Sequence, residues 1–139
     1  MDMMPQEIVR RYYASLAPGR RQDLMELLDP QVILDIQEGF PGARARYVGH
    51  KAYVEDFLYS FYGSFDLELF AEEFLECGAR VVVEGRMKGK AVATGIPVDV
   101  PFVHIWTVYS GRMVSARMYT DTALLRDALT GHPVSIIAP

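Results

Sequence analysis

The sequence predicts an α+β fold, with helices in its first half and a curved antiparallel sheet in its second. Two observations carry this prediction. Apolar residues recur at helical spacing up to about residue 62, whereas apolar and polar residues alternate, as in strands, from residue 66 onward. A chain of 139 residues can bury one substantial core, so we expect a single domain over 1–139, with 130–139 as an extended tail.

The first half is predicted to hold three helices and one short strand. The first helix begins at Pro5, because a proline in the first turn has no helical N–H partner to lose, and it ends near Pro18-Gly19. The other segments follow in order: a helix over 21–28, a strand over 32–36, a loop over 37–49 and a helix over 50–62.

The second half is predicted to be a meander of antiparallel strands. The strands cover 66–76, 80–88, 91–98, 100–109 and 112–120, and Gly95-Ile96-Pro97 interrupts the third of them. Asp121 then precedes a short helix over 123–129 and has the side chain of a helix cap.

The turn at Ser110-Gly111 decides which side chains share a face of the last two strands. If Gly111 closes a three-residue loop with a G1 bulge, His104 lies opposite Ala116. One face then carries Phe102, His104, Trp106, Val114, Ala116, Met118 and Thr120. A single histidine and the single tryptophan on an otherwise apolar concave face indicate a ligand site.

Composition excludes several classes of function. A net charge of −4 disfavours nucleic acid as a partner, and no apolar run has the length of a membrane span. Cys77 is the only cysteine, so no internal disulfide forms, and we expect a cytoplasmic protein. No motif for a metal, a nucleotide or an acyl-enzyme nucleophile is present, so we expect no metal and no cofactor.

Two segments, GHKAYVEDFLYSF and HIWTVYSGRMVSARMYTDTALL, resemble the SnoaL-like family of the nuclear-transport-factor-2-like (NTF2-like) superfamily. The resemblance extends from residue 8 to about residue 129. It implies a cone in which a curved antiparallel sheet folds around three N-terminal helices, with a short C-terminal helix and an apolar cavity. The superfamily includes polyketide cyclases, ketosteroid isomerases, epoxide hydrolases and members without a catalytic role, so the fold does not fix the function.

The resemblance implies roles for three polar residues. His104 stands where SnoaL-like cyclases carry a pocket histidine, although a core histidine with one hydrogen bond is the alternative. Asp35 lies on the first strand, as does the general base of ketosteroid isomerases; it is either buried in the cavity with a raised pKa or exposed to solvent. Tyr12 matches the helix tyrosine that donates to the oxyanion, with Tyr13 as a substitute, and packing is the alternative role.

Further residues are candidates for binding the substrate. Asp56 and Ser60 lie one turn apart on a predicted helix, where phenazine biosynthesis proteins carry a pocket histidine and serine; an exposed Asp56 is the alternative. The cavity walls are expected to include Trp106, Phe57, Met118, Phe102 and Met87. Met118 replaces the acid of related cyclases and hydrolases, and no thioether can exchange a proton, so epoxide hydrolysis is not expected.

These residues predict a cofactor-independent enzyme that transfers a proton α to a carbonyl group. Asp35 would be the base, and Tyr12 and His104 would donate to the enolate. Such chemistry cyclises, isomerises or dehydrates an apolar, polyketide-like or other ring-bearing compound. The alternative is a non-catalytic module that binds a ligand or a protein partner. We also expect a homodimer, because Val103, Ile105 and Tyr109 would leave the convex face apolar.

Overall fold

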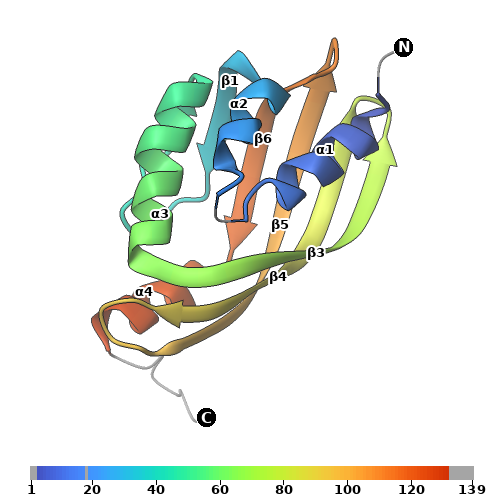
Figure 1. The fold of residues 1–139 in the computed structure, drawn as a ribbon. Coiled ribbons are helices and arrows are strands. Elements are labelled where there is room, and N and C mark those ends of the chain that lie inside the picture. Colours follow the sequence, from blue (N-terminus) through green and yellow to red (C-terminus); the bar gives the residue numbers. More distant parts are fainter. Residues whose placement is uncertain (1–2, 18, 132–139) are drawn as a thin grey trace.

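The computed structural model describes residues 3–17 and 19–131, and within them it has an α+β architecture built on one six-stranded sheet. The helices are α1 (Pro5–Ala14), η1 (Arg21–Asp23), α2 (Leu24–Leu27), η2 (Ala52–Leu58), α3 (Tyr59–Ser64) and α4 (Thr122–Thr130). The strands are β1 (Leu28–Ile36), β2 (Arg46–Val48), β3 (Phe65–Cys77), β4 (Arg80–Ala91), β5 (Pro97–Tyr109) and β6 (Arg112–Thr120). The sheet is strongly curved, and α1, α2 and α3 lie on its concave side (Figure 1).

The sheet is mixed, which corrects the prediction of an entirely antiparallel one. Its strand order is β2-β1-β6-β5-β4-β3, and β1 runs parallel to β6 while every other pairing is antiparallel. A lone strand between helices carries no sequence signal for the direction of a partner about eighty residues away. The expected loop over 37–49 contains β2, and the expected strand over 91–98 is mainly the turn between β4 and β5.

The β5–β6 turn is tighter than predicted. Ser110 and Gly111 both have positive φ, 50° and 78°, so a two-residue turn places Tyr109 opposite Arg112. The irregularity lies further along β6, where Val114 is the extra residue between two paired positions. His104 is therefore opposite Met118, and the predicted pairing of His104 with Ala116 is wrong.

The bulge nevertheless leaves most of the predicted face intact. Phe102, Trp106, Ala116 and Met118 are buried on the concave side as expected, but Met113 takes the inward position that was assigned to Val114. The shorter turn and the bulge each shift the register by one residue in the same direction, and a total shift of two residues keeps the same side chains on the concave face. The face that carries His104 is therefore established by two local features acting together.

The last helix closes the described part of the chain. The Asp121 carboxylate accepts a hydrogen bond from the Leu124 amide at 3.1 Å, which confirms its capping role, and Gly131 ends the helix with a left-handed conformation. Of the expected tail over 130–139, Thr130 belongs to α4 and residues 132–139 lie outside the described residues. Within residues 3–17 and 19–131, no helix has the length and apolarity needed to cross a membrane.

Candidate functional site

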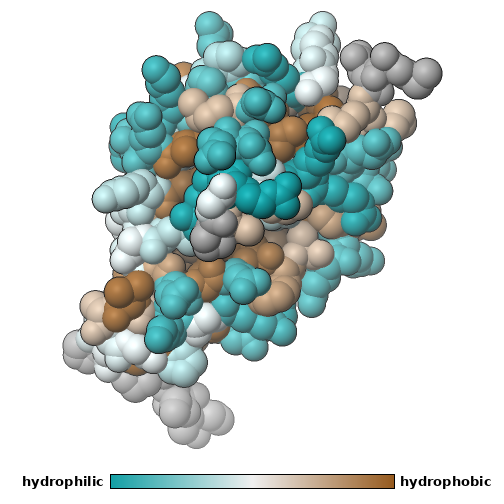
Figure 2. All heavy atoms as spheres, in the orientation of Figure 1, coloured by the Kyte–Doolittle hydropathy of each residue, from teal (hydrophilic) through white to brown (hydrophobic). Residues whose placement is uncertain are grey.

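A mainly apolar cavity lies between the concave face of the sheet and the helices. It is narrow, with a free volume of about 30 Å³, which is room for one or two water molecules. The polar groups on its wall belong to Tyr12, Tyr53, Tyr62, His104, Tyr119 and Thr120. The rest of the wall is apolar: Leu16, Phe40, Phe57, Leu58, Phe61, Leu69, Met87 and Met118. In the orientation of Figure 1, hydrophobic residues reach the surface near the middle of the molecule, between hydrophilic ones (Figure 2).

Most of the helical wall of the cavity comes from η2 and α3, which form one continuous helix in Figure 1, and α1 adds Tyr12. Tyr53, Phe57 and Phe61 form a stripe along it, with interplanar angles of 13° and 5° between successive rings. The η2 segment is π-helical, a rare geometry that is frequent at functional sites. It places the Tyr53 hydroxyl against β6, where that hydroxyl donates to the Met118 sulfur at 3.9 Å.

A chain of hydrogen bonds determines which ring nitrogen of His104 carries the proton. Trp106 Nε1 donates to the Tyr13 hydroxyl at 3.0 Å, and that hydroxyl lies 2.5 Å from His104 Nδ1. An indole N–H can only donate, so the Tyr13 oxygen is an acceptor there and its own proton is free for the imidazole. If Nδ1 carried a proton instead, the buried Tyr13 proton would have no acceptor. The arrangement therefore favours the tautomer with its proton on Nε2.

His104 is a neutral hydrogen-bond donor in this site. Burial lowers the pKa of the imidazole to about 3, so it is uncharged at neutral pH. Its Nε2 has no hydrogen-bond partner among the described residues and retains accessible surface on a side chain that lines the cavity. The imidazole can thus donate to a ligand oxygen without carrying a charge.

A second chain of hydrogen bonds joins Tyr12, Tyr53 and Met118. The Tyr12 and Tyr53 hydroxyls are hydrogen-bonded to each other. Because Tyr53 donates to the Met118 sulfur, Tyr12 must donate to Tyr53. Burial raises the pKa of both phenols, so both stay protonated. Sulfur is a weak acceptor. The Tyr53 hydroxyl could therefore donate its hydrogen bond to a ligand oxygen beside Met118 instead of to the sulfur.

The structure places Asp35 outside the cavity. Val32, Leu34 and Ile36 face the core, so the alternation of β1 directs Asp35 to the other side of the sheet. There it forms a bidentate ion pair with Arg46, at 2.7 and 3.1 Å, which lowers the pKa of the carboxyl group. This corrects the expectation of a buried base, and the solvent-facing alternative holds.

Asp56 and Ser60 also lie outside the cavity. The Asp56 carboxylate is exposed and pairs with Arg44 at 2.9 Å, and Ser60 is exposed on the same helix. Within the described residues no carboxylate lines the cavity, and no group of three histidine, cysteine or acidic side chains could hold a metal ion.

Two expected wall residues lie behind the wall. Phe102 packs against the His104 ring with centroids 4.4 Å apart, and the Trp106 ring lies 4.6 Å from that of Tyr12. Both support the polar side chains and do not line the cavity. Tyr53 and Tyr62 were not among the predicted site residues. The spacing of Tyr53, Phe57 and Phe61 is that of one face of a helix, and this signal could have placed Tyr53 beside the predicted wall residue Phe57.

Comparisons with known proteins agree with this fold. A family model described as SnoaL-like domain matches residues 9–116. An NTF2-like protein of unknown function from Burkholderia pseudomallei K96243 is 27% identical with a TM-score of 0.78, over 92% of this chain and 99% of that one. A protein from Jannaschia sp. CCS1, named provisionally as a SnoaL-like polyketide cyclase, is 23% identical with a TM-score of 0.80, over 96% and 99%.

TerC, crystallised with polyporic acid, is 24% identical to this chain with a TM-score of 0.80, over 91% of this chain and 99% of its own. A comparison of the sequence with curated proteins gave no match.

Proposed function

Because the chain belongs to the SnoaL-like domain family, we propose that its cavity binds a ring-bearing, polyketide-like carbonyl compound and promotes ring closure or isomerisation. The observation that carries this proposal is the neutral His104 imidazole, whose Nε2–H is available at an apolar wall. A neutral donor in a site of low polarity stabilises the negative charge that develops on a carbonyl oxygen. The proposed chemistry needs no cofactor.

Two donors converge on the same part of the cavity. His104 and Met118 are cross-strand partners on β5 and β6, and the Tyr53 hydroxyl reaches Met118. A carbonyl oxygen between them would accept from His104 Nε2 and from Tyr53 in place of the sulfur. Tyr12 donates to the Tyr53 oxygen, so the Tyr53 proton points away from Tyr12 and toward the space beside Met118. Tyr12 therefore acts through Tyr53 in this proposal.

Ring closure from an enol suits a cavity that offers donors and no carboxylate. The enol carbon attacks a second carbonyl carbon, so that a carbon–carbon bond forms and the attacked oxygen becomes an alkoxide. The enol oxygen loses its proton to water and the alkoxide gains one from water, so no net proton is consumed. His104 and Tyr53 stabilise the alkoxide as it forms. Asp35, ion-paired outside the cavity, has no part in this scheme.

The structural relatives agree with a ring-bearing ligand. TerC was crystallised with polyporic acid, and the Jannaschia protein carries a provisional cyclase name. Aromatic walls such as Phe57 and Phe61 provide flat apolar surface, and burial of such surface contributes about 25 cal/mol per Å².

Binding without turnover is the second candidate function. The observation that favours it is the absence of a carboxylate from the described cavity wall, since removal of a carbon-bound proton normally uses a side-chain base. A binding protein would use the same donors to hold a carbonyl oxygen. The two functions differ in whether the bound compound reacts.

The test is the exchange of α-hydrogens in 1-tetralone, an enolisable bicyclic ketone, followed by NMR in heavy water. In this exchange water accepts the α-proton and His104 stabilises the enolate oxygen, so we expect the wild-type protein to accelerate the exchange and His104→Ala to lower that acceleration by about a hundredfold. Asp35→Asn is the control and should leave the rate unchanged. Full exchange in His104→Ala contradicts the proposal, and binding of 1-tetralone without accelerated exchange supports the second candidate.

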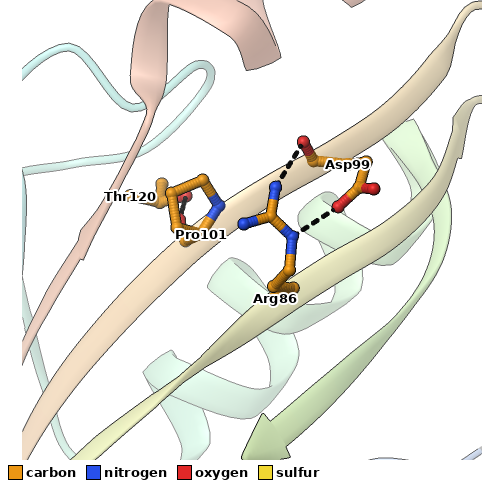
Figure 3. A network of polar contacts seen from close by, with 4 residues as sticks. All are labelled: Arg86, Asp99, Pro101 and Thr120. Atoms are coloured by element: carbon orange, nitrogen blue, oxygen red, sulfur yellow. Dashed lines mark hydrogen bonds and ion pairs between the residues drawn. The ribbon is translucent and has the colours of Figure 1, made fainter.

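We propose that two copies associate through the convex face of the sheet. Val103 and Ile105 face outward beside Tyr109 and Tyr119, which are 72% and 41% exposed. The Arg86–Asp99 ion pair, at 2.7 Å, joins β4 and β5, and Arg86 is the cross-strand partner of Pro101, two residues before Val103 (Figure 3). An apolar area of this kind is typical of an interaction site.

We expect analytical ultracentrifugation at micromolar concentration to give a dimer and Ile105→Asp to give a monomer, because a buried unpaired charge opposes association. A monomeric wild-type protein would refute this proposal.

A further inference from the structure

A second cavity adjoins the one that contains His104. Its free volume is about 190 Å³, larger than that of the first. Leu16, Tyr62 and Leu69 line both cavities and separate them. Tyr13, which bonds to His104 Nδ1, lines the second cavity. The two cavities are therefore neighbouring compartments divided by three side chains.

Arg21 is the cation of this second compartment. Its Nε donates to the Leu16 carbonyl oxygen at 3.1 Å, and its guanidinium carbon lies 3.9 Å above the centre of the Tyr62 ring. These two contacts hold the guanidinium in place. Its terminal nitrogens have no hydrogen bond and no anion within 4.0 Å among the described residues. An arginine held in this way is prepared to bind a carboxylate through two hydrogen bonds.

The acidic residue of the compartment does not neutralise Arg21. Glu68 lines the same cavity, but it belongs to the exposed series of β3, whereas its neighbours Leu67 and Leu69 face inward. In the sheet Glu68 is the cross-strand neighbour of Lys88 on β4, and within the described residues no ion pair joins Glu68 to Arg21. Arg21 therefore remains available to an anion that enters from outside.

Building on the proposed function, we propose that the ligand also carries an acidic group, which Arg21 binds in the second compartment. The uncharged ring system of the ligand lies beyond Tyr62, in the apolar cavity. The carbonyl oxygen of the ligand accepts a hydrogen bond from His104 there. The ligand class is thus a ring-bearing keto acid. The protein has a net charge of −4, which repels anions overall, so a preference for an acid requires a local cation such as Arg21.

Tyr62 is the side chain that must move. The first cavity alone is too narrow for a ring, but displacement of Tyr62 would join it to the larger one. The Tyr62 hydroxyl makes no hydrogen bond with a described residue, and its ring is held to Arg21 by a cation–π contact. A carboxylate that binds Arg21 can replace that contact, so binding of the acid and opening of the partition are coupled.

The test compares two ligands of the same shape, the anion 1-tetralone-6-carboxylate and the neutral 1-tetralone-6-carboxamide, by calorimetric titration at about 0.15 M salt. We expect the wild-type protein to bind the carboxylate about tenfold more tightly, and Arg21→Gln to bind the two equally, with the affinity for the carboxamide unchanged. Arg20→Gln is the matched control, because Arg20 pairs with Asp23 and lines neither cavity.

Three outcomes would overturn the proposal: equal binding of both ligands by the wild-type protein, a preference that survives in Arg21→Gln, or an equal loss in Arg20→Gln. In each case the carboxamide still binds, and the proposed function stands. Failure of both ligands to bind would instead refute the proposed function itself, and the assignment of a keto acid with it.

Discussion

Met118→Asp is expected to lower the free energy of unfolding by about 4 kcal/mol at neutral pH. Met118 is 5% exposed, and its sulfur contacts the Tyr53 hydroxyl beside His104. A carboxylate there is removed from water and has only neutral donors near it, so folding raises its pKa by several units. Because the folded state binds the proton more tightly than the unfolded state, the variant should regain stability as the pH falls toward 4.

Chemical denaturation of the variant at several pH values measures this effect. Met118→Leu is the matched control and should cost less than about 1.5 kcal/mol, since it conserves volume and introduces no charge. Wild-type stability in Met118→Asp at neutral pH would mean that position 118 is hydrated. The apolar cavity and the place of the Tyr53 hydroxyl in it would then both be incorrect.

The strands of the meander could be predicted because one face of each strand packs against the core and the other face is exposed to solvent. Alternation of apolar and polar residues is strong there, and the predicted strand over 112–120 coincides with β6. The three-residue strand β2 has a single buried residue, Tyr47, and so shows no periodicity. Its partner β1 also pairs with β6, and the direction of that pairing depends on contacts far apart in the sequence.

The turn before β6 shows how a local error can leave the site nearly unchanged. Asn and Gly are the usual residues of a two-residue turn with positive φ, and Ser110 is not among them, so the sequence favoured the longer loop. The bulge at Val114 had no sequence signal at all. Its one-residue shift restores the inward direction of Met118 and Ala116, which is why the concave face could still be predicted.

The polar part of the site was harder to predict than its apolar walls. Whether Asp35 or its neighbours face inward depends on a register difference of one residue, in a strand that has apolar residues on both faces. The role of Tyr13 follows from a contact across 91 residues of sequence, and a helical pattern could only show that Tyr12 and Tyr13 lie on adjacent faces. The partition at Tyr62 depends on Arg21, which the sequence presents as an ordinary cation near a helix start.

His104 is expected to make the protein lose stability steadily as the pH falls below about 6.5, the ordinary pKa of histidine. Burial lowers the pKa of the folded-state imidazole to about 3, so between these values the unfolded chain binds a proton that the folded one does not. Folding is favoured above this window, and each pH unit inside it removes about 1.4 kcal/mol. Denaturant titrations between about pH 7 and pH 4.5 measure the slope before most carboxylates titrate.

His104→Gln isolates the contribution of this one group. The glutamine cannot titrate, and its amide oxygen can still accept from the Tyr13 hydroxyl that now bonds to Nδ1. His50 and His132 remain in both proteins and cancel in the comparison. The wild-type protein should therefore lose about 2–3 kcal/mol more than His104→Gln over this range. Equal slopes would show that His104 becomes protonated in the folded state, and a charged imidazole would then face the ligand in place of the neutral donor.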